Sequence, residues 1–175
     1  MKKYILASLF AGVAFFGLTS CEDDRDSNPT LNTPESFVLN APALAGNIYD
    51  LENSDSLVFT CKQPDYGYTA AVTYYMQISL TDVWENELDE EGKVVGNPKM
   101  MELENYSTSA KLKANAKDIN KAIMQMGGYA AEEEMPKTTP LYIRLRAKLA
   151  SGSTCYSNTI QTTVKPYFAV LVAAD

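Results

Sequence analysis

Two segments of this chain alternate apolar and polar side chains with a period of two residues. The first runs from Val72 to Leu80 and the second from Leu141 to Leu149. Apolar residues at every second position place one face of a strand against a core and leave the other face toward solvent. The pattern therefore predicts two half-buried β-strands. Their outward parity carries Thr73, Tyr75, Gln77 and Ser79 in the first segment, and Tyr142, Arg144, Arg146 and Lys148 in the second.

Shorter strand signals surround these two segments, with turn residues between them. A helix is expected from Asn115, a good capping residue, to the glycine pair at 127–128. The further strands are expected at 37–39, 56–60, 99–103, 107–113 and 160–164.

About seven short strands separated by turns are typical of an antiparallel sandwich. We therefore predict an all-β fold, an immunoglobulin-like antiparallel β-sandwich over residues 36–167, with one short helix before the penultimate strand. The predicted core includes Phe59, Tyr74, Ile78, Ile143, Leu145 and Ile160.

The first 20 residues have the features of an export signal. Lys2 and Lys3 precede an apolar stretch over 5–17, which is shorter than the roughly 20 residues of a spanning helix. The stretch ends in Leu-Thr-Ser before Cys21, which resembles the bacterial lipobox, whose cysteine is acylated. We expect lipidation at Cys21 and anchoring through its acyl chains. The alternative is an ordinary signal peptide cleaved near a cysteine.

Residues 21–35 are predicted to form a tether, because they are acidic, contain proline and have little apolar content. The acidic run at 22–26 resembles the signal that sends Bacteroidetes lipoproteins to the outer face of the outer membrane. A solvated acidic linker would have the same composition. At the other end, residues 168–175 form an apolar tail without alternation, whose role the sequence leaves open.

Charge and composition exclude several functions. The chain has 15 Lys and Arg against 22 Asp and Glu, a net charge of -7, which disfavours nucleic acid as a partner. It has no histidine, so the usual Ser-His-Asp and Cys-His nucleophiles are absent. The acidic loop at 85–96 superficially resembles a calcium loop that would begin at Glu87. The twelfth position of such a loop needs a glutamate, and here it is Pro98. We expect neither an enzyme nor a bound cofactor or metal.

Three aromatic residues are candidates for contact with a glycan or a protein partner. Tyr75 and Tyr142 stand on the outward parity of strands that should be neighbours, and Trp84 lies beside the acidic loop. Exposed aromatic rings supply stacking surfaces for ligands. The same tyrosines are also explained by cross-strand pairing, which we favour, and Trp84 could instead cover the end of the core.

Once Cys21 is acylated, Cys61 and Cys155 are the only pair that could form a disulfide. Cys61 shares the inward parity of Leu57 and Phe59, whereas Cys155 is out of phase with Ile160 and could lie in the turn at 151–154. Export permits the bond and parity argues against it, so both states stay open.

Several short motifs together resemble the N-terminal domain of SusE-type outer-membrane lipoproteins of Bacteroidetes polysaccharide-utilisation systems. They are the lipobox, Phe37–Pro42, Leu57–Thr60, Asp65–Gly67, Tyr74, Asp118–Asn120, Leu141–Ala147 and Ser157–Ile160. In this resemblance an immunoglobulin-like spacer precedes domains that capture starch or other glycans. Cys61 departs from the family, which often has tryptophan there.

The resemblance implies a lipid-anchored accessory protein at the cell surface, in a system for glycan capture and uptake. Its implied partners are the outer membrane, a glycan, and a transporter or sister lipoproteins. The sequence stops at Asp175, where the family's carbohydrate-binding domains would begin. We therefore expect this domain to act mainly as a membrane-proximal spacer. The alternative is a surface adhesion or scaffold lipoprotein that binds another protein.

Overall fold

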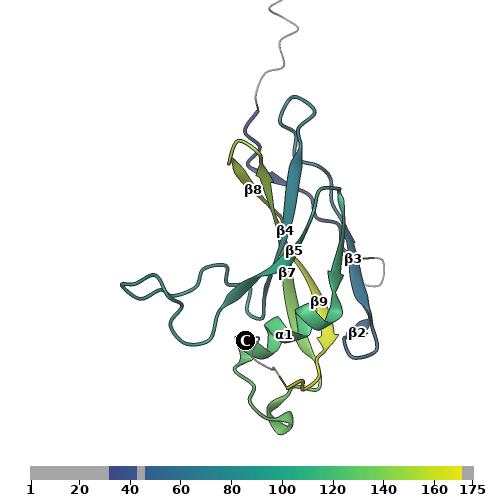
Figure 1. The fold of residues 1–175 in the computed structure, drawn as a ribbon. Helices are drawn as coiled ribbons and strands as arrows, with labels where there is room; N and C mark the ends of the chain where they lie inside the picture. Colours follow the sequence, from purple (N-terminus) through teal and green to yellow (C-terminus); the bar gives the residue numbers. More distant parts are fainter. Residues whose placement is uncertain (1–31, 43–45, 171–175) are drawn as a thin grey trace, which may run out of the picture.

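The computed structural model describes residues 32–42 and 46–170, so Cys21 lies outside the described residues. The described chain is mostly β (Figure 1). Its elements are β1 (Ser36–Phe37), β2 (Ile48–Asp50), β3 (Ser56–Thr60), β4 (Val72–Ser79), β5 (Met100–Ser107), β6 (Lys111–Asn115), α1 (Ala116–Gly127), a 3-10 turn (Glu132–Glu134), β7 (Thr139–Leu149), β8 (Thr154–Ser157) and β9 (Ile160–Lys165). Within these ranges no helix is long and apolar enough to cross a bilayer.

The two strands with strict alternation form the centre of the larger sheet. β4 and β7 pair antiparallel over eight residues, from Val72 with Leu149 to Ser79 with Tyr142. β5 pairs with the free edge of β4. Both β8 and β9 pair with the other edge of β7, β8 toward its C-terminal end and β9 toward its N-terminal end. The larger sheet therefore grows outward from one strand pair.

The second layer is a two-stranded sheet of β3 and β6, and α1 packs against β3, β5 and β6. Asn115 caps the helix by accepting a hydrogen bond from the backbone N–H of Lys117 at 2.8 Å. Gly128 ends it with a left-handed φ of 65°, a conformation that favours glycine. The helix begins and ends where the sequence predicts.

The fold class is confirmed as an all-β sandwich with one short helix. All six predicted core residues are buried: Phe59, Tyr74, Ile78, Ile143, Leu145 and Ile160. They belong to one cluster that joins both sheets and the helix. Burial of one parity of each strand against this cluster supplies the main favourable free energy of folding.

The strand arrangement departs from the prediction in several places. β8 lies between the two strands expected to be last, so the helix does not precede the penultimate strand, and β2 was not predicted. The single strand expected at 107–113 is misplaced, because the chain turns at 108–110 and the next strand, β6, begins at Lys111. The sandwich is also not wholly antiparallel, since β1 pairs with β8 and β2 with β9 in parallel. The strands β1, β2 and β8 are two to four residues long, too short for a clear periodic signal.

Candidate functional site

The outward side of the larger sheet carries two arginines stacked on aromatic rings. We call this the arginine–aromatic face; it consists of Tyr75, Trp84, Tyr106, Arg144, Arg146 and Tyr156, with Gln77 and Glu102 between them. β4 and β7 supply Tyr75, Arg144 and Arg146 through their outward parity. β5 supplies Tyr106, β8 supplies Tyr156, and the connection after β4 supplies Trp84.

Each arginine covers an aromatic ring. The guanidinium carbon of Arg144 lies 4.5 Å from the ring centroid of Trp84 and 4.3 Å from that of Tyr156. The guanidinium carbon of Arg146 lies 4.4 Å from the centroid of Tyr75. Such cation–π contacts favour arginine, whose planar group also stacks on rings.

A hydrogen-bond network through Gln77 and Glu102 joins the two arginines. Arg146 donates two hydrogen bonds to the Glu102 carboxylate, at 2.8 and 2.6 Å. Gln77 donates to the same carboxylate at 2.9 Å, and its carbonyl oxygen accepts from Nε of Arg144 at 2.8 Å. Gln77 is buried, so its amide obtains both partners from the sheet itself.

The same contacts shift the pKa values of Glu102 and of the two arginines. Burial alone would raise the pKa of Glu102, but hydrogen bonds from Arg146 and Gln77 and the charges of Arg146 and Lys148 lower it below its usual value. The hydrogen bonds to Glu102 raise the pKa of Arg146, whereas burial lowers that of Arg144. Glu102 is therefore held as the carboxylate that balances the arginine pair.

The structure brings two of the three predicted contact residues together. Tyr75 and Trp84 both lie in the arginine–aromatic face, linked through the arginines and Gln77. Tyr142 lies on the same parity of β7 as Arg144, but among the described residues it forms no stacking contact with either arginine. Tyr75 also packs on Tyr106 of β5, with 5.9 Å between ring centroids, a cross-strand partner that the sequence did not predict.

Sequence reasoning missed Glu102, Tyr106 and Tyr156 as members of this face. The β5 register shifts between Tyr75 and Gln77, so Tyr106 lies opposite Tyr75 while Glu102 lies opposite Gln77. Tyr156 belongs to the unpredicted β8, where it lies opposite Arg146. The sequence carries no clear signal for β8, because its four residues place Ser157 inward and Tyr156 outward.

Cys61 and Cys155 are free and buried in the structure, so no disulfide joins them there. The backbone of Cys61 forms an isolated antiparallel β-bridge with Leu39. Cys155 lies in β8 opposite Ala147 rather than in the preceding turn. Burial raises the pKa of Cys61 to about 11 and also raises that of Cys155. Both thiols are therefore protonated and unreactive at neutral pH.

An open groove of about 600 Å³ lies between the β2–β3 connection, β6 and the start of α1. It is lined by Glu52–Ser56, Asn105, Lys113, Asn115 and Lys117. Asn115 is used as the helix cap, and Asn105 donates to Asp118 at 2.9 Å. None of the lining residues is aromatic, so the groove lacks a stacking surface for a sugar ring.

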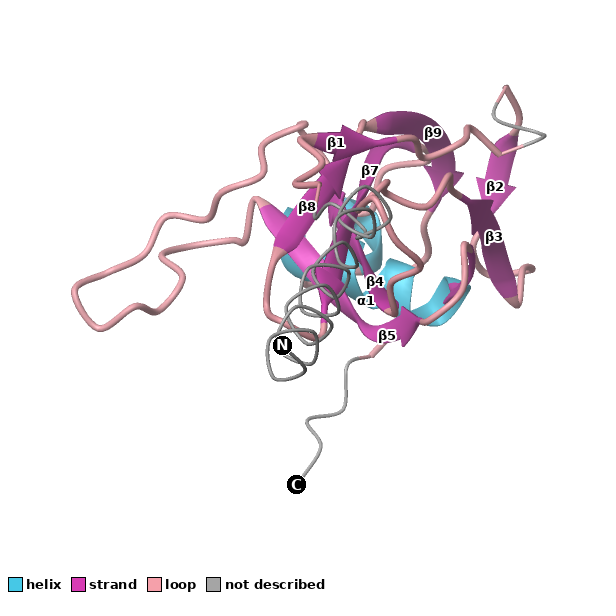
Figure 2. Cartoon of the chain, turned by 90° about the horizontal axis from the view of Figure 1, so that it is seen from above, coloured by secondary structure: helices cyan, strands magenta, loops and turns pink. Residues whose placement is uncertain are grey.

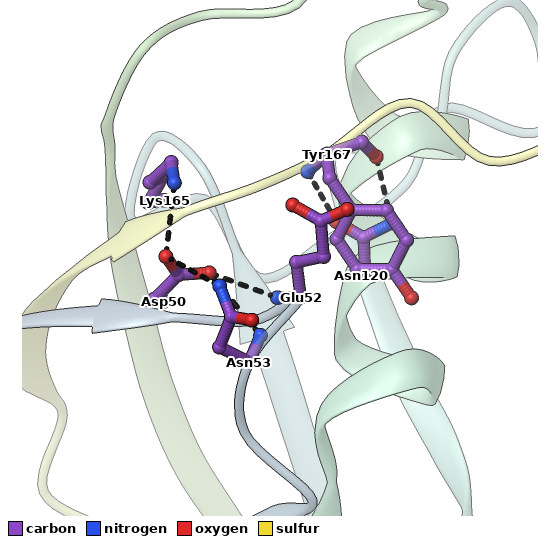
Figure 3. Close-up of polar contacts among 6 residues, drawn as sticks. All are labelled: Asp50, Glu52, Asn53, Asn120, Lys165 and Tyr167. Carbon is purple, nitrogen blue, oxygen red and sulfur yellow. Dashed lines mark hydrogen bonds and ion pairs between the residues drawn. The ribbon is translucent and has the colours of Figure 1, made fainter.

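Polar contacts also fix the segment by which the chain leaves the sandwich after β9 (Figure 3). The buried Asn120 of α1 donates to the Tyr167 carbonyl and accepts from the Tyr167 N–H, both at 2.9 Å. Lys165 pairs with Asp50 at 2.9 Å. Hydrogen bonds from Lys165 and Asn53 lower the pKa of Asp50 to about 2. We call Asn120 with Tyr167 the exit clamp.

We predict that Glu102→Gln lowers the free energy of unfolding at neutral pH by about 1 to 2 kcal/mol, a value discounted because the ion pair keeps some solvent contact. Folding lowers the pKa of Glu102, so its contribution is fully present above about pH 4.5 and is lost as the pH falls through the lowered value. Denaturant unfolding across this range measures the effect. Glu104→Gln, on the same strand but exposed, is the control. An equal loss in both variants, or a loss independent of pH, would contradict the prediction.

The sandwich thus carries a cation–π face, a polar groove and a fixed exit. The family model of the SusE outer membrane protein matches residues 23–146, which is more than half of the chain. No solved structure is significantly similar to it. The chain therefore belongs to the SusE outer membrane protein family.

Proposed function

We propose that this chain is a lipid-anchored accessory protein at the cell surface, in a system that captures and imports glycans such as starch. Within it, the domain described above acts mainly as a membrane-proximal spacer. Family membership gives the outer membrane and a Sus-type system. The finer assignment rests on the positions at which the chain enters and leaves the sandwich.

The described chain enters the sandwich at one end and leaves it at the other (Figure 1). β1 lies opposite Tyr156, which lies opposite Arg146 of β7. The end of β9 lies opposite Thr139, seven residues away along β7. At the usual rise per residue this separates the two points by about 24 Å. A domain with this path holds whatever follows it away from whatever precedes it.

The exit clamp makes this separation directional. Because Asn120 is buried and bonds both backbone groups of Tyr167, the segment after β9 follows α1 instead of leaving at a variable angle. Ala169 continues this course, with its N–H 3.4 Å from the sulfur of Met124. A fixed exit is what a spacer needs.

The arginine–aromatic face weighs against a sugar platform. A sugar stacks on an open aromatic face, whereas Arg144 and Arg146 each occupy a face of Trp84, Tyr156 or Tyr75. Binding there would have to displace contacts already made. A scaffold that binds another protein is a second candidate function, favoured by the projecting connection between β4 and β5.

We expect the soluble mature domain to bind maltooligosaccharides and a panel of other glycans more weakly than about 1 mM, or roughly -4 kcal/mol, in calorimetric titration. The reason is the occupancy of the aromatic faces by arginine. Tighter binding that is lost in Trp84→Ala or Tyr75→Ala, and kept in the control Tyr68→Ala, would overturn the spacer assignment in favour of a glycan site. Tyr68 is exposed and stands outside the arginine–aromatic face.

We expect Asn120→Ala to release the exit segment without unfolding the sandwich. Spin labels at Val38→Cys and Val170→Cys, both exposed positions, report the distance between the two ends in a soluble form beginning at Glu22. Cys61 and Cys155 should escape labelling because both side chains are buried in the core. We expect a narrow distance distribution in the parent and a broad one in Asn120→Ala. The exposed neighbour substitution Lys121→Ala should leave it narrow. Equal widths in all three proteins would contradict a clamped exit.

We expect Cys21→Ala to abolish the lipid anchor. Intact mass should show acylation of the parent protein that begins at Cys21, and the variant should leave the detergent phase because multiple acyl chains supply the membrane affinity. Cys155→Ala, which leaves the lipobox untouched, should partition like the parent. A Cys21→Ala protein that remains wholly in detergent would show that another segment anchors the chain.

A further inference from the structure

The connection between β4 and β5 projects away from the sandwich. It spans residues 80–99, between the end of β4 at Ser79 and the start of β5 at Met100. Both views show it reaching beyond the rest of the fold (Figures 1 and 2). Connections of this length within a compact domain are uncommon and usually serve binding. We call residues 85–99 the arm.

The arm has a defined conformation of its own. Leu88 and Val94 form an antiparallel bridge, and the Asp89 carboxylate accepts from the backbone N–H groups of Glu91 and Lys93 at 2.9 and 2.8 Å. At its base the Asn86 side chain donates to the Met100 carbonyl and accepts from the backbone N–H groups of Lys99 and Met100. The arm is thus ordered by local polar contacts.

The ordered arm exposes apolar side chains. Every residue from 87 to 97 is exposed, and Leu88, Val94 and Val95 have exposed fractions of 59, 41 and 52%. A two-stranded hairpin with no core of its own is marginally stable in water. These side chains therefore contribute little to folding, and covering them would stabilise the arm.

The arm is also acidic. Residues 85–99 contain five acidic residues and two lysines, and the lysines pair within the arm, Lys93 with Glu91 and Lys99 with Glu87. The remaining charge is negative and flanks the apolar residues. A surface that fits this edge offers an apolar recess bordered by lysine or arginine.

We propose that the arm docks into an apolar, basic-rimmed recess on a second, different protein. Charge argues against the other occupants. A second copy of this chain carries a net charge of -7, and an anionic lipid surface would repel the same carboxylates.

The arm is held at a fixed angle by the arginine–aromatic face. Trp84, just before the arm, stacks on Arg144, and its indole N–H donates to Asp82 at 2.9 Å. Asp82 has a φ of 57°, a left-handed conformation uncommon outside glycine. Because these contacts fix the residues before the arm, the arm loses less conformational freedom when a partner binds its apolar side chains.

Photo-crosslinking in the cells that make the protein tests the proposal. The probe is p-benzoylphenylalanine, placed in the full chain at position 88 or 95, with position 58 as control. Val58 is exposed to a similar degree but lies on β3. We expect both arm positions, and not the control, to crosslink one protein that mass spectrometry can identify. Crosslinks only to a second copy or to lipid, or none above the control, would overturn the proposal.

The identified protein is then purified and its affinity for the full chain measured. We expect Leu88→Ser with Val95→Ser to weaken binding by about tenfold or more, and Val58→Ser to leave it unchanged. Glu85→Lys with Glu90→Lys should also weaken binding and reduce its dependence on salt. Thermal unfolding of the Leu88→Ser, Val95→Ser variant should be unaltered, since both residues are exposed. Unchanged affinity in both double variants would refute the docking role even if crosslinks form.

Discussion

The antiparallel pair of β4 and β7 is the interaction on which the rest of the domain depends. In the described part of the chain, β5 joins the larger sheet through β4, and β8 and β9 join it through β7. Because the register of this pair is fixed over eight residues, one parity of each strand faces the core and the other faces the opposite side of the sheet. A slip of one residue would place Arg144 and Arg146 in the core, so the hydrophobic pattern and the buried charge penalty specify the same register.

The two arginines on the outward parity of β7 need partners for their charge and for their planar faces. Arg144 and Arg146 lie over a sheet whose neighbouring Gln77 is buried, and a partly dehydrated guanidinium needs partners. Glu102 supplies the charge, Gln77 links the two sides, and the aromatic rings cover the planar faces. The face is therefore explained by the demands of its own arginines before any ligand is considered.

The sequence allowed the centre of this arrangement to be predicted and left its edges open. Ile78, Ile143 and Leu145 could be assigned to the core because long alternation has one explanation, and Asn115 marks a helix start by local chemistry. Glu102 could not be assigned, because its place opposite Gln77 depends on a register shift in β5. Tyr156 depends on a four-residue strand held by its neighbours. Pairing between distant segments decides such positions, and a single sequence does not encode it as a period.

The same face also explains why Tyr75 and Trp84 were brought together although they bind no sugar in the proposed function. Trp84, just before the arm, stacks on Arg144 of the sheet, and the same guanidinium also lies over the ring of Tyr156. Opening these rings to a ligand would loosen the arm, so a glycan site and a rigid arm compete for the same residues. Trp84 already has partners within the fold, since its indole N–H donates to the Asp82 carboxylate and Arg144 lies over its ring. In this domain the arginine–aromatic face supports the base of the arm, and the arm is the surface that remains free to contact a partner.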